Sequence, residues 1–330
     1  MRSMILKICK RLAGMLIMVL IVASFTFFLV RIIPGNPVQA KYLSLVSKGV
    51  SPYQANIQVR ALYGFLPQTS LWHQYISYMV DLFHLNLGQS ITYTGDSVSQ
   101  IMSDALPWTI GLVSIGIIIS FVLGVIMGVV AAVKRSSKTG DAVTWGSTFL
   151  HSIPNYLLGV LLIFLFSTFW RLFPVGSPYD ASLKPGLNIP FLASLLRHLF
   201  LPIATYVISG YGGWTLSMKS SVISVLGDDF ILASELRGMR RGIIVRYIAR
   251  NAFLPLFTGL ALTLGFMFGG SALIETVFNI QGLGYLLTSS TGALDYPLME
   301  GCFLLITVAV ILANAVADVL YTVIDPRVRG

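Results

Sequence analysis

The chain has 330 residues, of which 55% are hydrophobic and only 11% are charged. This composition excludes an ordinary soluble domain, in which about 25% of the residues are charged, and indicates a membrane protein. The formal net charge is +9, but no recognised nucleic-acid-binding motif accompanies the basic residues.

Six apolar windows are each long enough to cross a bilayer, which takes roughly 20 residues of helix. The first window follows a basic segment and exceeds the usual apolar core of a signal peptide, so we expect an uncleaved first helix. The second and third windows are each 29 residues long, so we expect tilt, or interfacial turns near Pro107 and Pro154. In chain order the windows are 12–30, 105–133, 142–170, 198–218, 251–274 and 301–324.

The lysines and arginines indicate the orientation of these spans. If the N-terminus is inside, the four inner segments hold 15 of the 22 basic residues in 57 positions, and the outer segments hold 7 in 129 positions. Because basic residues concentrate in cytoplasmic loops, both termini are predicted to be cytoplasmic, and the net charge reflects topology. The inner segments are 1–11, 134–141, 219–250 and 325–330.

The basic segment 219–250 is predicted to contain a short helix that Asp228 and Asp229 begin and Gly238 ends. A short helix between two spans, with small residues where another surface must approach, is typical of a docking element. The alternative is an ordinary positively charged loop. The residues predicted to share one face of this helix are Phe230, Ala233, Ser234 and Arg237.

Several motifs that would give the chain its own chemistry are absent from the sequence. There is no G-x-x-x-x-G-K-[ST], so the chain is not itself the usual kind of ATPase. Neither G-x-S-x-G nor H-E-x-x-H occurs, and the histidines show no ligand spacing, so no catalytic or metal site is expected. Cys9 and Cys302 are too far apart in the predicted topology for a disulfide. Apart from Asp318, the spans hold no charged residue away from their ends, which disfavours a proton-coupled transporter.

Short motifs extend along nearly the whole chain. They are R-x-x-P-G-N-P at 31–37, L-G-Q-S at 87–90, E-T-V-F at 275–278 with G-L-G at 282–284, D-Y-P at 295–297, and D-P-R-V-R at 325–329. With Ala233, Gly238 and R-N-A-F-L-P at 250–255, they resemble the permeases of binding-protein-dependent ABC importers, in the oligopeptide, dipeptide and nickel branch. Leu232 and Ser234 depart from the family's loop pattern, which has Glu and Ala there, so the docking register stays open.

The resemblance implies an all-α integral membrane fold of the type I ABC importer permeases, with six transmembrane helices. It divides the chain into 1–33, the N-terminal tail and first helix; 34–104, an extracytoplasmic loop; and 105–330, a five-helix core with the coupling loop 219–250. The implied location is the bacterial cytoplasmic (inner) membrane. The implied partners are a second homologous permease, two cytoplasmic ATP-binding subunits and an extracytoplasmic solute-binding protein, with ATP and Mg bound by the ATP-binding subunits and no cofactor in this chain.

The resemblance also assigns roles to particular residues. Those expected to couple to the ATPase are Asp229, Phe230, Ala233, Ser234, Glu235, Arg237 and Gly238. The residue types of the fifth and sixth spans, and not the resemblance, suggest the residues considered for the translocation path or gate: Phe266, Met267, Phe268, Asn314 and Asp318. Each of the last two has a structural alternative, because a polar pair at i and i+4 also suits a contact with a neighbouring helix.

Three questions stay open from the sequence. The amphipathic stretch 70–85, with apolar residues from Trp72 to Phe83, is either a platform for a binding protein or a helix resting on lipid. The glycines 124, 128, 210, 212 and 213 indicate helix packing, and those near Trp214 alternatively loosen their span. The solute is expected to be a short peptide or peptide-like compound, with a nickel chelate, an opine or glutathione as alternatives, and a stand-alone secondary transporter or channel as the rival class.

Overall fold

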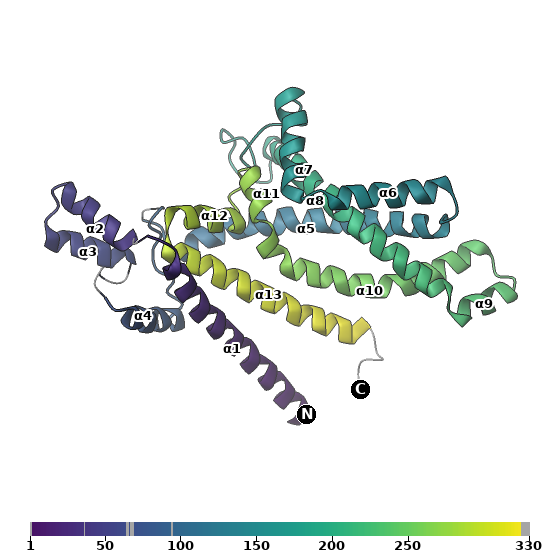
Figure 1. Ribbon diagram of the computed structural model, residues 1–330, viewed down its shortest axis with the longest axis horizontal. Helices are drawn as coiled ribbons and strands as arrows, with labels where there is room; N and C mark the ends of the chain where they lie inside the picture. Colours follow the sequence, from purple (N-terminus) through teal and green to yellow (C-terminus); the bar gives the residue numbers. More distant parts are fainter. Residues whose placement is uncertain (1, 36, 64–65, 67–68, 94, 325–330) are drawn as a thin grey trace. The chain divides into compact units, whose positions relative to one another are not determined.

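The computed structural model describes the backbone of residues 2–35, 37–63, 66, 69–93 and 95–324 (Figure 1). In those ranges every regular element is a helix, and the one β-bridge joins Gln89 to Ser97. The chain divides into two compact units, each described here by itself. Unit 1 comprises Met1–Thr109 and Gln281–Ile311, and unit 2 comprises Ile110–Ile280 and Leu312–Gly330.

Two long helices, α5 and α13, begin in unit 1 and end in unit 2. Unit 1 also contains α1 (Arg2–Ile32), α2 (Pro37–Ser47), α3 (Pro52–Tyr63), α4 (Leu71–Phe83) and α12 (Leu283–Ala293). Unit 2 also contains α6 (Lys138–Ser152), α7 (Asn155–Leu162), the π-helix η1 (Ile163–Phe169), α8 (Ile189–Leu226), α9 (Asp229–Leu236), α10 (Arg241–Gly270) and α11 (Ala272–Val277). The two shared helices are α5 (Val98–Val133) and α13 (Tyr296–Ile324).

Four helices in the described part of the chain are long and apolar enough to cross a membrane. They are Lys10–Ile32 of α1, Val98–Val133, Ile189–Leu226 and Tyr296–Ala315 of α13. Two bent pairs raise the number to six if each pair is one span: Lys138–Ser152 with Asn155–Phe169, and Gly242–Phe253 with Pro255–Leu264. These six segments overlap the six apolar windows of the sequence.

The expected turn near Pro154 is confirmed, because the chain bends there by 94°. Ile153 has a ψ of 123°, the extended value that a proline favours in the residue before it, and Pro154 itself has a ψ of 132°. The turn considered near Pro107 is wrong, since α5 runs through this proline without a break. A 36-residue helix is about 54 Å long, whereas a hydrocarbon core is ~30 Å thick. The helix α5 must therefore tilt in the bilayer or extend beyond the hydrocarbon core.

Glycines bring α5 and α6 close to α8 in unit 2. A Cβ atom on Gly128 of α5 would lie 2.5 Å from the Met218 Cβ of α8, and one on Gly124 would collide with Trp214. On α8, a Cβ at Gly212 would collide with the Ser147 carbonyl of α6. The predicted packing role of these glycines is confirmed. Figure 1 shows α6 beside α8, and α10 crosses α8.

Unit 1 is held together by small apolar clusters. Val38 of α2 packs with Val59 and Tyr63 of α3, which makes these two helices a hairpin (Figure 1). The C-terminal end of α1 packs on the start of α13, where Val30 contacts Tyr296 and Met299. Arg31 and Gly35 of the motif at 31–37 lie beside Tyr296 of the motif at 295–297, although more than 250 residues of sequence separate the two motifs.

Candidate functional site

Among the described side chains of the short helix α9, only Ile231 is buried. Ile231 is 3% exposed and lies in a core formed with α5, α8 and α10. Its neighbours in this core include Met218 and Val222 of α8, and Ile244 and Ile248 of α10. Any force applied to α9 therefore acts directly on the two long helices that flank it.

The opposite side of α9 is open to solvent. Phe230 is 40% exposed, and Ala233 and Arg237 are exposed beside it. Ser234 is half-buried, and its hydroxyl donates to the Phe230 carbonyl at 2.7 Å. Of the four residues predicted to share a face, Phe230, Ala233 and Arg237 are thus exposed, whereas Ser234, three positions after Ile231, is partly covered. Asp229 is also exposed, in the first turn, and the side chain of Glu235 lies outside the described residues.

The end of α9 has the geometry that the sequence predicts. Gly238 has a φ of +68°, the left-handed conformation that favours glycine after a helix. The Met239 amide donates to the Ser234 carbonyl at 3.2 Å, which is the six-residue bond of a Schellman motif. Because a Cβ atom on Gly238 would meet nothing within 4 Å, only the backbone conformation requires glycine here.

One exposed apolar residue at this end was not singled out from the sequence. Leu236 is 80% exposed at the last turn of α9, and Leu232 is 57% exposed one turn earlier. Neither side chain packs in the core that holds Ile231. Exposed leucines on a segment between two spans are compatible with contact to a protein or to lipid.

A second constellation lies in unit 1, around the buried carboxylate of Asp295. This carboxylate accepts hydrogen bonds from the Ser90 hydroxyl at 2.6 Å and from the amides of Ile91 and Thr92, both at 2.9 Å. Burial, with the nearby Asp295 carboxylate as the second cause, raises the pKa of the Tyr63 phenol to about 12. The L-G-Q-S and D-Y-P motifs therefore form one structure, in which an acid near the start of α13 fixes a loop before α5.

The third feature is an ion pair between Arg31 and Glu300, whose side chains are each 8% exposed. The Arg31 guanidinium also donates to the Gln74 side chain at 3.1 Å and to the Phe27 carbonyl at 3.0 Å, and it lies 3.5 Å above the Phe27 ring. A buried charge is costly unless it is paired and hydrogen-bonded, and both conditions are met here. The pair joins the C-terminal end of α1 to the first turns of α13.

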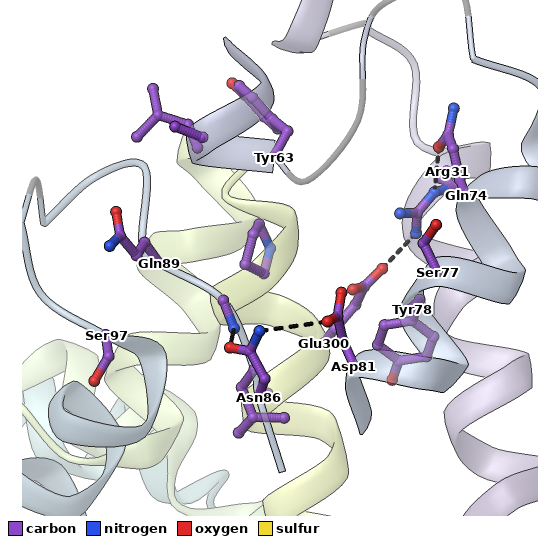
Figure 2. A pocket seen from close by; sticks show the side chains of 16 residues that line it. Arg31, Tyr63, Gln74, Ser77, Tyr78, Asp81, Asn86, Gln89, Ser97 and Glu300 are labelled. Carbon is purple, nitrogen blue, oxygen red and sulfur yellow. Dashed lines mark hydrogen bonds and ion pairs between the residues drawn. The ribbon is translucent and has the colours of Figure 1, made fainter. Parts of the chain in front are cut away.

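Beside this ion pair lies a cavity of about 380 Å³ that both polar and apolar residues line. Figure 2 shows Arg31 and Glu300 on its wall, with Ser77 and Asp81 of α4 nearby. The Asp81 carboxylate accepts a long bond of 3.4 Å from the Asn86 side chain, whose oxygen in turn accepts from the Gly88 amide at 3.1 Å. The cavity is formed entirely within unit 1.

The predicted gate residues are placed only in part. The side chains of Phe266, Met267, Phe268 and Asp318 lie outside the described residues. Asn314 is half-buried, and its side-chain oxygen has no hydrogen-bond partner among the described groups. Neither the translocation role of these residues nor the structural alternative is decided by these positions, so both stay predictions.

The ion pair is the functional feature that sequence reasoning missed. From the sequence, Arg31 and Asp295 are identified only as motif residues, and Glu300 falls just before the sixth apolar window. The signal that was available is chemical: an arginine and a glutamate each border an apolar span at its predicted outer end. Such charges need partners of opposite sign when they are buried, although the sequence does not say which residues pair.

Comparison with known proteins agrees with this geometry. Residues 120–330 match the family model described as "Binding-protein-dependent transport system inner membrane component". A peptide permease protein of Brucella ovis is 31% identical over 94% of this chain and 95% of its own length. A peptide transport system permease of Brucella abortus is 31% identical over 98% of both chains. A nickel import system permease of Staphylococcus aureus is 30% identical over 97% of this chain and 90% of its own.

The family match covers the exposed helix α9, its anchor Ile231 and the helices α8 and α10, and the relatives extend over unit 1 as well. It is a family of transport subunits of the inner membrane, and the multiple apolar helices fit that location. The chain belongs to the family of inner-membrane permease components of binding-protein-dependent transport systems.

Proposed function

We propose that this permease subunit forms half of the translocation pathway of an ATP-binding cassette importer, with six spans and both termini in the cytoplasm. The observation that carries the proposal is the construction of α9, whose Ile231 is fixed in the core while Phe230, Ala233 and Arg237 are exposed. A short element built in this way suits docking to a motor subunit. The charge bias of the loops supports the same orientation, because it puts 219–250 on the cytoplasmic side.

The proposed cycle is alternating access. A solute-binding protein delivers its solute on the outer side, and two partner subunits bind ATP and Mg in the cytoplasm. Their closure displaces α9, and the Ile231 contacts pass the displacement to α8 and α10. A second, homologous permease supplies the other half of the pathway. Nucleotide and loaded binding protein shift the equilibrium only through their different affinities for the inward-open and outward-open states.

The proposed solute is a short peptide or a peptide-like compound. Two of the relatives above are named for peptide transport, which supports this choice, while the similarly related Staphylococcus aureus permease is named for nickel import. A nickel chelate is therefore the alternative within the same family. Mass spectrometry of the solute that co-purifies with the cognate binding protein separates the two, because a nickel ion or a peptide mass is read directly.

The experiment on α9 uses two pairs of substitutions. Gly238→Val places a β-branched residue at φ +68° and costs about 1 kcal/mol in backbone strain, whereas Gly242→Val changes a helical glycine whose Cβ would also meet open space. Ala233→Glu adds a bulky charge to the exposed face, and Ser136→Glu adds it to another exposed loop predicted to be cytoplasmic.

Pull-down of the ATP-binding subunits and ATP-driven uptake are measured at matched membrane expression. We expect Ala233→Glu and Gly238→Val to lower both at least tenfold, with both control variants near wild type. Wild-type values for Ala233→Glu and Gly238→Val would contradict the docking role and would mean that 219–250 is an ordinary basic loop. Uptake by this chain without any ATP-binding subunit would instead support the stand-alone transporter.

A further inference from the structure

The helix α4 presents three different faces. Tyr75 and Tyr78 pack against α1, and the Phe27 ring lies 5.4 Å from each of their rings. A second face is polar and lines the cavity with Gln74, Ser77 and Asp81. The third face is apolar, and no described residue of unit 1 covers it. Its residues are Trp72 (66% exposed), Ile76 (45%), Val80 (52%) and Phe83 (67%).

The position of α4 along α1 places this third face at a definite depth. The Tyr75 hydroxyl is 2.9 Å from the Ser24 hydroxyl, and the Tyr75 ring stacks on Phe28 at 5.4 Å. Ser24 precedes the end of α1 at Ile32 by eight residues, which corresponds to about 12 Å of helix. Both Ser24 and Phe28 belong to the candidate span Lys10–Ile32. The helix α4 therefore lies beside the outer third of a membrane-spanning segment and not beyond its end.

The apolar face of α4 continues a surface of the same character on α1. Ile21, Phe25 and Phe28 of the candidate span are 62%, 63% and 42% exposed. The ring of Trp72 lies 5.6 Å from the ring of Tyr75, which itself contacts Phe28, so aromatic side chains connect the two surfaces. Tryptophan and tyrosine are enriched where a protein meets the boundary between lipid tails and headgroups.

We propose that α4 is embedded in the extracytoplasmic leaflet of the bilayer, with lipid acyl chains covering Trp72, Ile76, Val80 and Phe83. The helix lies in the interface with its apolar face toward the hydrocarbon and its polar face toward the cavity, as amphipathic interfacial helices do. Of the two interpretations of the stretch 70–85, the depth of the Tyr75 contacts selects lipid and not a binding-protein platform. The choice of leaflet rests on the proposed orientation, whereas contact with acyl chains does not.

The test is site-directed spin labelling of the full chain in its assembled complex, in nanodiscs of phosphatidylethanolamine and phosphatidylglycerol. The background is Cys9→Ser with Cys302→Ala. Ile76→Cys reports the apolar face, and Asp81→Cys on the same helix reports the polar face. Phe25→Cys of α1 is the lipid standard, and Tyr53→Cys of α3, whose native side chain is 76% exposed, is the aqueous standard.

We expect the label at position 76 to collide with oxygen as often as the lipid standard at position 25 does. Its collisions with a water-soluble nickel chelate should be at least fivefold fewer than those of the aqueous standard at position 53. The label at 81 should match the aqueous standard. Free access of the nickel chelate to 76 would overturn the proposal. Shielding of 76 from both reagents would also overturn it, because a protein partner would then cover this face.

A second measurement keeps the native face intact. Brominated acyl chains should quench the part of the tryptophan fluorescence that Trp72→Phe removes, by at least half, and an unquenched Trp72 signal would contradict the proposal. Neither readout requires transport. If the complex transports normally but the label at position 76 is accessible to water, only the proposed lipid contact is refuted. If the wild-type chain does not associate with the ATP-binding subunits, only the proposed function is refuted.

Discussion

The Arg31–Glu300 pair places two opposite charges where the protein largely buries both. The Arg31 side chain is 8% exposed and lies against the Phe27 ring, so its charge is largely removed from water. Desolvation of each ion costs several kcal/mol, which the attraction and the hydrogen bonds from Gln74 and Phe27 must offset. Removal of one partner is therefore more damaging than removal of both.

We expect Arg31→Met to destabilise unit 1 by about 3–5 kcal/mol, because it leaves the Glu300 carboxylate buried without its cation. The double variant Arg31→Met with Glu300→Leu should recover most of that loss. Thermal stability of the purified protein in detergent checks the prediction. As a control, Arg60→Met on α3 removes an exposed arginine and should change little. Additive losses in the double variant would show that the two side chains do not depend on each other.

At the scale of elements, the crossing of α5 and α8 depends on the absence of side chains. A Cβ atom on Gly128 would lie 2.7 Å from the Thr215 carbonyl as well as 2.5 Å from Met218, and a backbone oxygen cannot move aside. Gly111, on the same helix, has open space at its Cβ position. The two glycines therefore separate a packing requirement from a general effect of glycine replacement.

We expect Gly128→Val to destabilise the protein by about 1–3 kcal/mol through overpacking. Gly111→Val should be neutral or slightly stabilising, since valine restricts the unfolded chain more than glycine does. Size-exclusion chromatography after graded heating measures both variants against wild type. Equal melting of the two variants would contradict a close α5–α8 contact.

The membrane-spanning elements were largely predictable from the sequence, because the length of each apolar window reflects the thickness of the hydrocarbon core that a helix must cross. The bend at Pro154 and the end of α9 at Gly238 followed from local chemistry. The uninterrupted path of α5 through Pro107 did not, because neighbouring groups in a membrane protein can satisfy the carbonyl that a proline releases. The Arg31–Glu300 and Asp295–Ser90 contacts were missed because each joins residues more than 200 positions apart, which no local pattern encodes.

At the scale of the whole molecule, orientation is the property to test. Gly242→Cys in the predicted coupling loop should react with a membrane-impermeant thiol reagent only from the cytoplasm. Gly292→Cys should react only from outside, because 275–300 is predicted to be extracytoplasmic. Both native glycines have open space at the Cβ position, so neither cysteine perturbs packing. Labelling of position 242 in intact cells, or protection of position 292 there, would reverse the six-span topology.

The contacts that close unit 1 also impose an order on biosynthesis. Glu300 is translated 269 residues after Arg31, and Asp295 is translated 205 residues after Ser90. At about 5–20 residues per second, a ribosome takes on the order of 10–50 s to cover such a distance. During that time the first span is already emerging from the insertion machinery while its acidic partner does not yet exist. Only a nearly complete chain can form the Arg31–Glu300 pair at the C-terminal end of the first helix. This contact is therefore present in finished molecules and absent from truncated ones.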